Sequence, residues 1–239
     1  MFSYNSIRPD DLGVSVKDLQ RTITPVLGSV SRTSKGGVGS TFIKRTVGER
    51  NTQITLQIKG AKTYQELQTI VTRVAEWFNV EEPKKLVFDD KPNKYLLAIA
   101  SGELDLSQTY TYGVIKVKLV SHDPHYYASA QTTKTLTGTG TFTNQSTMRT
   151  YWEMTVRFNA NMSGVQLTLG DSIIKLTGDY VANDAVFITS DVLVQYNGRK
   201  NMSKLTLDSK LKQLGVGEVS YTFPANTTAT LRYRGVYIN

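Results

Sequence analysis

Only one segment of this 239-residue chain has the hydrophobic spacing of an α-helix, whereas its other apolar stretches mostly alternate with polar residues at period two. The clearest alternation is in residues 51–59, where Ile54, Leu56 and Ile58 share one face. A strand with one apolar face needs a second layer to cover that face. The pattern therefore predicts a mainly β protein that contains a single helix.

The predicted helix begins with a capping box, Thr63-Tyr-Gln-Glu66. In this motif the Thr63 hydroxyl accepts from the Glu66 amide, and the Glu66 carboxylate returns to the Thr63 amide. Apolar residues follow at helical spacing: Leu67, Ile70, Val71, Val74 and Phe78. Pro83 stops any continuation. We expect one stripe of this helix to face a core.

Short strands are predicted around this helix: residues 12–16, 22–27, 42–47, 85–88, 95–100 and 112–121. A turn rich in Asp, Pro and Asn at 89–93 joins two of them as a hairpin. The segment from Gly28 to Ser40 is small, polar and glycine-rich. Such a segment is typical of a mobile loop or an extended arm.

The composition changes to Thr, Ser and Gly at residues 129–150. We interpret this stretch as a linker between an N-terminal domain, 1–128, and a C-terminal domain, 151–239. The second domain has no helix signal, and its strand candidates predict an antiparallel β-sandwich or jelly roll. These candidates are 152–158, 165–169, 173–176, 185–188, 192–196, 204–207, 218–223 and 229–237. Asn197-Gly198 predicts a type I′ turn between two of them.

Composition excludes several classes of protein. The absence of Cys removes thiolate metal sites, cysteine nucleophiles and disulfides. The longest apolar runs are far shorter than the roughly 20 residues of a membrane span, so no membrane insertion is predicted. No export signal is visible at the N-terminus. The net charge of +8 is shared equally by residues 1–128 and 129–239, without long basic runs, so sequence-specific nucleic-acid binding is not predicted.

Two motifs resemble catalytic or metal sites but are incomplete. Lys35-Gly-Gly-Val-Gly-Ser-Thr41 resembles a phosphate loop, yet Ser40 replaces the lysine and a strand-like segment follows where a helix is needed. His122-Asp-Pro-His125 holds both histidines, but no further His or Cys exists to complete a closed zinc site. No nucleophile elbow is present. We therefore expect no enzyme activity, no metal and no cofactor.

Adjacent carboxylates occur at Asp10-Asp11, Glu81-Glu82 and Asp89-Asp90. Neighbours on a strand point to opposite faces, so we interpret these pairs as solvated surface groups rather than as the acid and base of a glycoside hydrolase.

Aromatic residues leave a second function open. Trp152 with Tyr151, and the group Tyr221, Tyr233 and Tyr237, are able to form a sugar-stacking platform, although core packing is the commoner fate of strand aromatics. The alternative function is therefore a carbohydrate-binding β-sandwich module that adheres to a cell-surface glycan. It predicts sugar binding by the fragment 145–239, abolished by Trp152→Ala.

The order of features along residues 1–128 carries a family resemblance. The helix ends in Trp77-Phe78, and Leu86-Val-Phe-Asp-Asp90 leads to Lys94-Tyr-Leu-Leu-Ala98 and then to Leu119-Val-Ser-His-Asp-Pro-His-Tyr-Tyr127. This order resembles the N-terminal domain of the distal tail protein (Dit) family of siphophages infecting Gram-positive bacteria. In the second half, residues 174–180 and 191–200 are similar to the C-terminal sandwich of the short family members.

The resemblance implies a structural virion protein at the phage tail tip, made in the host cytoplasm. Its N-terminal domains would form a hexameric ring, and its galectin-like C-terminal sandwiches would project outward. The ring would join the tail tube protein to a tail-associated baseplate or fibre protein of the host-adsorption apparatus, with a receptor-binding protein as a further partner. DNA would pass through it without being read. The chain is too short for the carbohydrate-binding insertions of long family members.

Open strand edges beside a glycine-rich arm leave a half-domain poorly self-contained, and pairing with a neighbour would cover those edges. We therefore expect a homo-oligomer. We also expect the segment from Gly28 to Phe42 to reach onto the adjacent subunit. The predicted interface arm consists of Lys35, Gly36, Gly37, Val38, Gly39 and Phe42.

Overall fold

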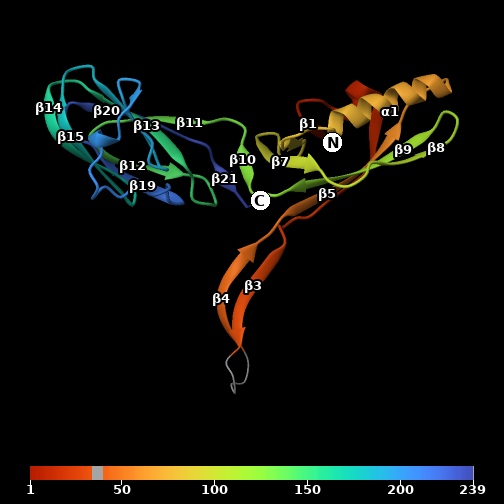
Figure 1. Cartoon of the computed structure of the whole chain (residues 1–239), viewed down its shortest axis with the longest axis horizontal. Helices are drawn as coiled ribbons and strands as arrows, with labels where there is room; N and C mark the ends of the chain where they lie inside the picture. Colours follow the sequence, from red (N-terminus) through yellow and green to blue (C-terminus); the bar gives the residue numbers. More distant parts are fainter. Residues whose placement is uncertain (34–39, 239) are drawn as a thin grey trace. The chain divides into compact units, whose positions relative to one another are not determined.

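The computed structural model describes residues 1–33 and 40–238. The protein is mainly β, as predicted, and the described residues contain one α-helix (Figure 1). The chain forms two compact units. Unit 1 is Met1–Tyr126 together with Ile238, and unit 2 is Tyr127–Tyr237.

Unit 1 is built on an antiparallel sheet in the order β1-β6-β7-β9-β5-β2, with β8 paired to β9. Its strands are β1 (Phe2–Tyr4), β2 (Val14–Arg21), β5 (Arg50–Ile58), β6 (Lys84–Phe88), β7 (Lys94–Ala100), β8 (Asp105–Gln108) and β9 (Gly113–Ser121). A 3-10 turn at Pro9–Leu12 precedes β2. The alternation in residues 51–59 is confirmed, because Ile54, Leu56 and Ile58 are all buried in β5.

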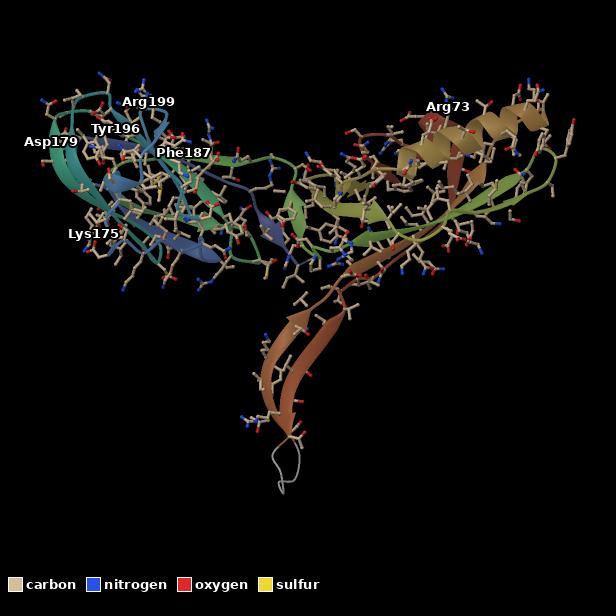
Figure 2. The ribbon with its side chains drawn as sticks, viewed as in Figure 1. Arg73, Lys175, Asp179, Phe187, Tyr196 and Arg199 are labelled. Carbon is tan, nitrogen blue, oxygen red and sulfur yellow. The ribbon has the colours of Figure 1, made fainter. Side chains whose placement is uncertain are left out.

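Helix α1 (Tyr64–Phe78) follows β5 and begins at the predicted N-cap. The Thr63 hydroxyl accepts from the Glu66 amide at 3.2 Å, but the Glu66 carboxylate accepts from the Lys62 amide, one residue earlier than the capping box predicts. Arg73 lies on the outer face of the helix (Figure 2). The residues of α1 that are buried in the core are Leu67, Val74, Trp77 and Phe78.

Trp77 is the core residue of α1 that the periodicity missed. Its ring packs with Phe2, Tyr4 and Phe78 at centroid distances of 5.9, 6.2 and 4.4 Å. The indole Nε1 donates to the Tyr4 carbonyl at 2.8 Å. This aromatic cluster ties the end of the helix to β1, a strand that the sequence did not predict.

Two further strands form a hairpin between β2 and β5. β3 (Leu27–Thr33) and β4 (Ser40–Val47) pair only with each other in the described chain (Figure 1). The strand predicted at 22–27 is wrong, since residues 22–26 carry no strand and β3 lies in the segment predicted as a loop or arm. The small residues that suggest a loop also suit a paired strand: a Cβ on Gly28 would meet the Thr46 hydroxyl at 2.5 Å.

Unit 2 is a sandwich of two antiparallel sheets, ordered β11-β20-β13-β16-β17-β18 and β12-β19-β14-β15. The strands are β11 (Thr132–Leu136), β12 (Thr139–Asn144), β13 (Trp152–Phe158), β14 (Met162–Leu169), β15 (Ser172–Tyr180), β16 (Ala185–Thr189), β17 (Val194–Tyr196), β18 (Arg199–Lys200), β19 (Gly217–Thr222) and β20 (Thr227–Tyr233). Two further short strands, β10 (Tyr126–Ala128) and β21 (Val236–Tyr237), pair with each other. The sandwich prediction is confirmed.

The core of the sandwich follows the predicted alternation. Trp152, Met154, Val156 and Phe158 of β13 are buried, and Phe158 stacks on Tyr180 at a centroid distance of 4.1 Å. The Asn197-Gly198 turn joins β17 to β18 with φ of 46° and 79°, as a type I′ turn requires. Residues 204–207 are not a strand, because a 3-10 turn at Met202–Lys204 and a single bridge from Leu205 take their place.

Residues 129–150 are part of the sandwich rather than a linker. β11 pairs with β20 along its whole length, and β12 pairs with β19. Leu136 is buried and Phe142 packs against the core. Thr, Ser and Gly suggest a linker by composition, yet Thr is also a good strand residue when backbone pairing and a few apolar anchors hold it. The chain leaves unit 1 after Tyr126 and returns to it at Ile238.

Candidate assembly interface

The β3–β4 hairpin, called the arm below, exposes the side chains of both strands. Leu27 pairs with Val47 and Ser31 with Phe42, and a bulge lies between Val30 and Ser31. An isolated two-stranded hairpin is only marginally stable in water. The arm therefore gains stability if a further surface covers it.

Large apolar side chains gather on the arm and at its base. Phe42 is 63% exposed and Ile43 55% exposed. Among the described residues of the arm and its base, the exposed apolar residues are Ile23, Val26, Leu27, Val30, Phe42, Ile43 and Val47. Phe42 and Ile43 are neighbours on β4 and point to opposite faces of the hairpin, so apolar side chains are exposed on both faces. Single exposed apolar residues are normal on a protein surface, whereas a group of them on one hairpin suggests an interaction site.

The charge of the arm has one sign. Between Thr24 and Gly48 the sequence has Arg32, Lys35, Lys44 and Arg45 and no acidic residue. An apolar surface with acidic groups at its margin would complement the arm.

The predicted interface residues are only partly described by the structure. Phe42 lies on β4 with its side chain exposed, opposite Ser31. Lys35, Gly36, Gly37, Val38 and Gly39 lie outside the described residues. Sequence reasoning selected the glycine-rich segment and missed the apolar residues on the two strands. Their signal was the row Phe42, Ile43 and Val47 beside a segment with no acidic residue.

Strand β2 is an edge of the main sheet, because among the described strands it pairs with β5 alone. Its outer backbone groups are open to another strand. Asp18 on β2, with Asp10 and Asp11 in the turn before it, adds exposed carboxylates along this edge. The same edge also carries Lys17 and Arg21 of β2, so its charge is mixed.

The two histidines have separate partners. His122 Nδ1 lies 2.6 Å from the Glu49 carboxylate, and His125 Nδ1 lies 2.6 Å from the Asp123 carboxylate. Across residues 1–33 and 40–238, no group of three His, Asp or Glu side chains is arranged to hold a metal ion.

The Asp89-Asp90 pair is engaged in ion pairs. Asp89 accepts from Arg8 at 2.6 Å, and Asp90 accepts two hydrogen bonds from Arg21. Arg21 holds the pKa of the Asp90 carboxyl below its ordinary value, chiefly through these hydrogen bonds. The two neighbours lie in the turn after β6 and bind different arginines, so they do not act as an acid and base pair on one substrate.

In unit 2, Trp152 is buried rather than displayed. Its indole Nε1 donates to the Lys212 carbonyl at 2.7 Å. Tyr151 is 66% exposed instead. It lines an open pocket of about 290 Å³ that also contains Glu153, Asp191 and Arg232. A sugar-stacking surface on this unit would therefore use Tyr151 and not Trp152.

No helix among the described residues is long and apolar enough to cross a membrane.

Both halves of the chain match families of phage tail proteins. Residues 14–121 match the family described as phage tail protein RIFT-related domain, and residues 145–237 match the siphovirus-type tail component, C-terminal domain. A comparison with curated proteins gives no match.

The crystal structure of the Dit (gp 19.1) protein of phage SPP1 is similar to this chain, with a TM-score of 0.83 and 14% identity, and 98% of each chain is covered. That structure is described as a paradigm of the hub adsorption apparatus in phages that infect Gram-positive bacteria. A chain of the phage p2 baseplate in its activated conformation with Sr is similar with a TM-score of 0.46 and 9% identity, over 92% of this chain and 90% of that one. The two family matches together cover most of the chain, and the protein therefore belongs to the distal tail protein (Dit) family of siphophages and is a component of the phage tail.

Proposed function

We propose that the protein is the hub of the distal tail: a hexameric ring, closed through copies of unit 1, that joins the tail tube protein to the tail-associated baseplate or fibre protein. Its role is structural, and DNA passes through the ring without being read. Family membership supports the tail position. The single observation that carries ring closure is the exposed apolar arm.

The occupant of the arm surface is a second copy of this chain. The apolar side chains of the arm need a cover, and its basic residues need acidic groups at the margin of that cover. The open edge of β2 offers backbone groups for pairing, with Asp10, Asp11 and Asp18 beside it. An arm placed on the β2 edge of another copy is a heterologous contact, and such contacts close into a ring when the rotation between copies allows it.

The test removes the apolar side chains of the arm. Phe42→Ser with Ile43→Ser should raise the protein concentration needed for ring formation by about tenfold or more, since two exposed apolar side chains lose their burial in the contact. Deletion of Lys35–Gly39 should weaken the ring in the same direction. Sedimentation velocity across a concentration series measures the change.

A matched control is Val192→Ser with Leu207→Ser, which removes two exposed apolar side chains of unit 2. This variant should assemble as the unmodified chain does. An unchanged ring in the arm variant would overturn the arm as the interface, and equal weakening by both variants would point to a general solubility effect.

A second function is supported by the pocket beside Tyr151. An exposed tyrosine ring with carboxylates and an arginine around it is the combination that binds sugars by stacking and hydrogen bonding. Binding of Gram-positive cell-wall glycans to unit 2, abolished by Tyr151→Ala and unaffected by Tyr110→Ala in unit 1, would establish it. No binding on a glycan array would exclude it and leave a purely structural sandwich.

A further inference from the structure

Arg50 is an arginine in the interior of unit 1, at the point where the arm rejoins the sheet. It is the first residue of β5, and its side chain is 1% exposed. Arginine is almost never buried this completely unless its charge is paired. Its surroundings therefore need an explanation.

The guanidinium donates to four backbone carbonyl oxygens. Nη1 donates to Thr22 at 2.9 Å and to Ile23 at 2.8 Å. Nε donates to Pro124 at 3.2 Å, and Nη2 donates to Ile238 at 2.7 Å. The guanidinium also lies over the Tyr126 ring, 5.0 Å from its centroid.

These carbonyls belong to segments that are far apart in the sequence. Thr22 and Ile23 follow directly after β2 and lead into the arm. Pro124 comes just before the chain leaves unit 1, and Ile238 is where the chain returns to it. One side chain therefore holds the base of the arm together with both ends of the excursion into unit 2.

The positive charge of Arg50 is stabilised by the dipoles of the four backbone carbonyls. Within the described residues, Arg50 makes no ion pair with a carboxylate. Burial lowers the pKa of its guanidinium, because the charge has lost its water. The planar fork of the guanidinium reaches acceptors in several directions at once, which the single ammonium of lysine does not.

The arm has few other ties at its base. The Thr22 amide donates to the Asn51 carbonyl at 3.3 Å, and the Val26 amide donates to the Glu49 carbonyl at 3.2 Å. The Gly48 amide donates to the Val26 carbonyl at 2.7 Å. The Thr22 hydroxyl also donates to the Asn51 carbonyl at 3.4 Å. Among the described residues, the arm strands themselves pair only with each other, and their side chains are exposed. The direction of the arm therefore depends on how its first residues are held.

We propose that Arg50 is the positioning residue of the arm: by binding the carbonyls of Thr22, Ile23, Pro124 and Ile238, it sets the direction in which the arm leaves unit 1. Ring formation then depends on a buried residue that touches no neighbouring subunit. The second statement rests on the proposed ring, whereas the first is a property of one protomer and is tested separately.

The direction of the arm can be measured as the distance between two spin labels. Because the sequence has no cysteine, two introduced cysteines are the only labelled positions. Spin labels at Arg45→Cys on β4 and Glu76→Cys on α1, both exposed positions, report the distance between arm and helix. At a dilution where only protomers are present, the doubly labelled protein that retains Arg50 should give one narrow distribution of distances between the two labels. Arg50→Met and Arg50→Lys should both broaden it at least about twofold, because neither side chain replaces the guanidinium fork.

The control is Leu56→Ala, which removes a buried side chain six residues further along the same strand. It lowers the stability of unit 1 without touching the base of the arm, so the distribution should stay narrow. A narrow distribution in Arg50→Met, or equal broadening in Leu56→Ala, would overturn the proposal.

A milder variant keeps the test decisive if Arg50→Met does not fold. A chain that ends after Tyr237 lacks the Ile238 acceptor, while Arg50 keeps its bonds to Thr22, Ile23 and Pro124. Its distance distribution should broaden to an intermediate width, and no broadening would contradict the proposal. Arg50→Lys should also raise the protein concentration at which rings form by about tenfold. In this variant the arm orientation that allows ring formation becomes a minor conformational state. If the unmodified chain forms no ring, the proposed function fails, while the label distances still decide the role of Arg50.

Discussion

The guanidinium of Arg21 forms two hydrogen bonds with the carboxylate of Asp90, with lengths of 2.8 and 2.5 Å. Arg21 ends the edge strand β2, and Asp90 follows β6. β7, β9 and β5 lie between these strands in the sheet order. Arg21 also lies over the Phe88 ring, 4.7 Å from its centroid. The sheet of unit 1 is therefore curled so that distant strands meet.

Asp90→Asn should lower the free energy of unfolding of unit 1 by about 0.5–1 kcal/mol at neutral pH, the range of a partly exposed ion pair. Because the folded-state pKa of Asp90 is lowered, the pair contributes fully above the unfolded pKa and loses its contribution as the pH falls below about 4 toward the folded value. Urea unfolding of both proteins at pH 7 and at low pH measures this. A difference that is equally large in acid would contradict the assignment.

Trp77→Phe should destabilise unit 1 by about 1–2 kcal/mol. The indole N–H bond to Tyr4 is lost, but the Tyr4 carbonyl keeps its bond from the Ile7 amide and is not left unpaired. Trp77→Ala should cost about 3–5 kcal/mol, since it also empties the aromatic cluster. Thermal and urea unfolding give both values, and Tyr64→Phe at an exposed position of α1 serves as the neutral control. Equal effects of the two Trp77 variants would show that packing contributes little.

Asp184 organises one end of unit 2. It accepts from the Tyr196 hydroxyl at 2.6 Å, from Asn197 Nδ2 at 2.8 Å and from the Val181 amide at 2.8 Å. The side chain of Tyr196 is labelled in unit 2 in Figure 2. The hydrogen bond from Asn197, followed by those from Tyr196 and Val181, lowers the pKa of the carboxyl.

Asp184→Ala should destabilise unit 2 by about 1 kcal/mol, because three partly buried hydrogen bonds to one carboxylate are lost and the released donors remain within reach of water. The change should appear in the unfolding of the fragment 127–237 and leave unit 1 unaffected. Asp208→Ala, which removes an exposed carboxylate paired with Lys175, is the matched control. A comparable loss in that control would contradict a special role for Asp184.

The pairing of β11 and β12 predicts which fragments of unit 2 fold on their own. A fragment of residues 127–237 should fold on its own, since it contains both complete sheets. A fragment that starts at residue 145 lacks β11 and β12, so it exposes one edge of β20 and of β19. Circular dichroism and amide exchange should show a cooperative sandwich only for the longer fragment. Equal protection in both would indicate that the two strands add nothing to the core.

Periodicity predicts the buried strands and the helix well. β5, α1 and β13 each bury a regular set of apolar side chains, and local chemistry adds the Thr63 cap and the Asn197-Gly198 turn. These elements follow from spacings of two or 3.6 residues and from turn residues with specific φ requirements.

The elements that were missed depend on partners far away in the sequence. β1 is three residues long and exists because β6 and Trp77 hold it. β11 and β12 have linker composition and exist because β20 and β19 pair with them. Arg50 gives no local signal at all, since its four acceptors include carbonyls at Pro124 and Ile238. Contacts between residues so far apart in the sequence cannot be predicted from local sequence patterns.

The central claim is that this chain closes into a ring through its arm. The most direct test is the molar mass in solution, measured by light scattering behind size exclusion across a concentration series. A discrete species of about six protomers, in reversible exchange with smaller forms, is the predicted result. A protein that stays monomeric at every concentration would contradict the ring.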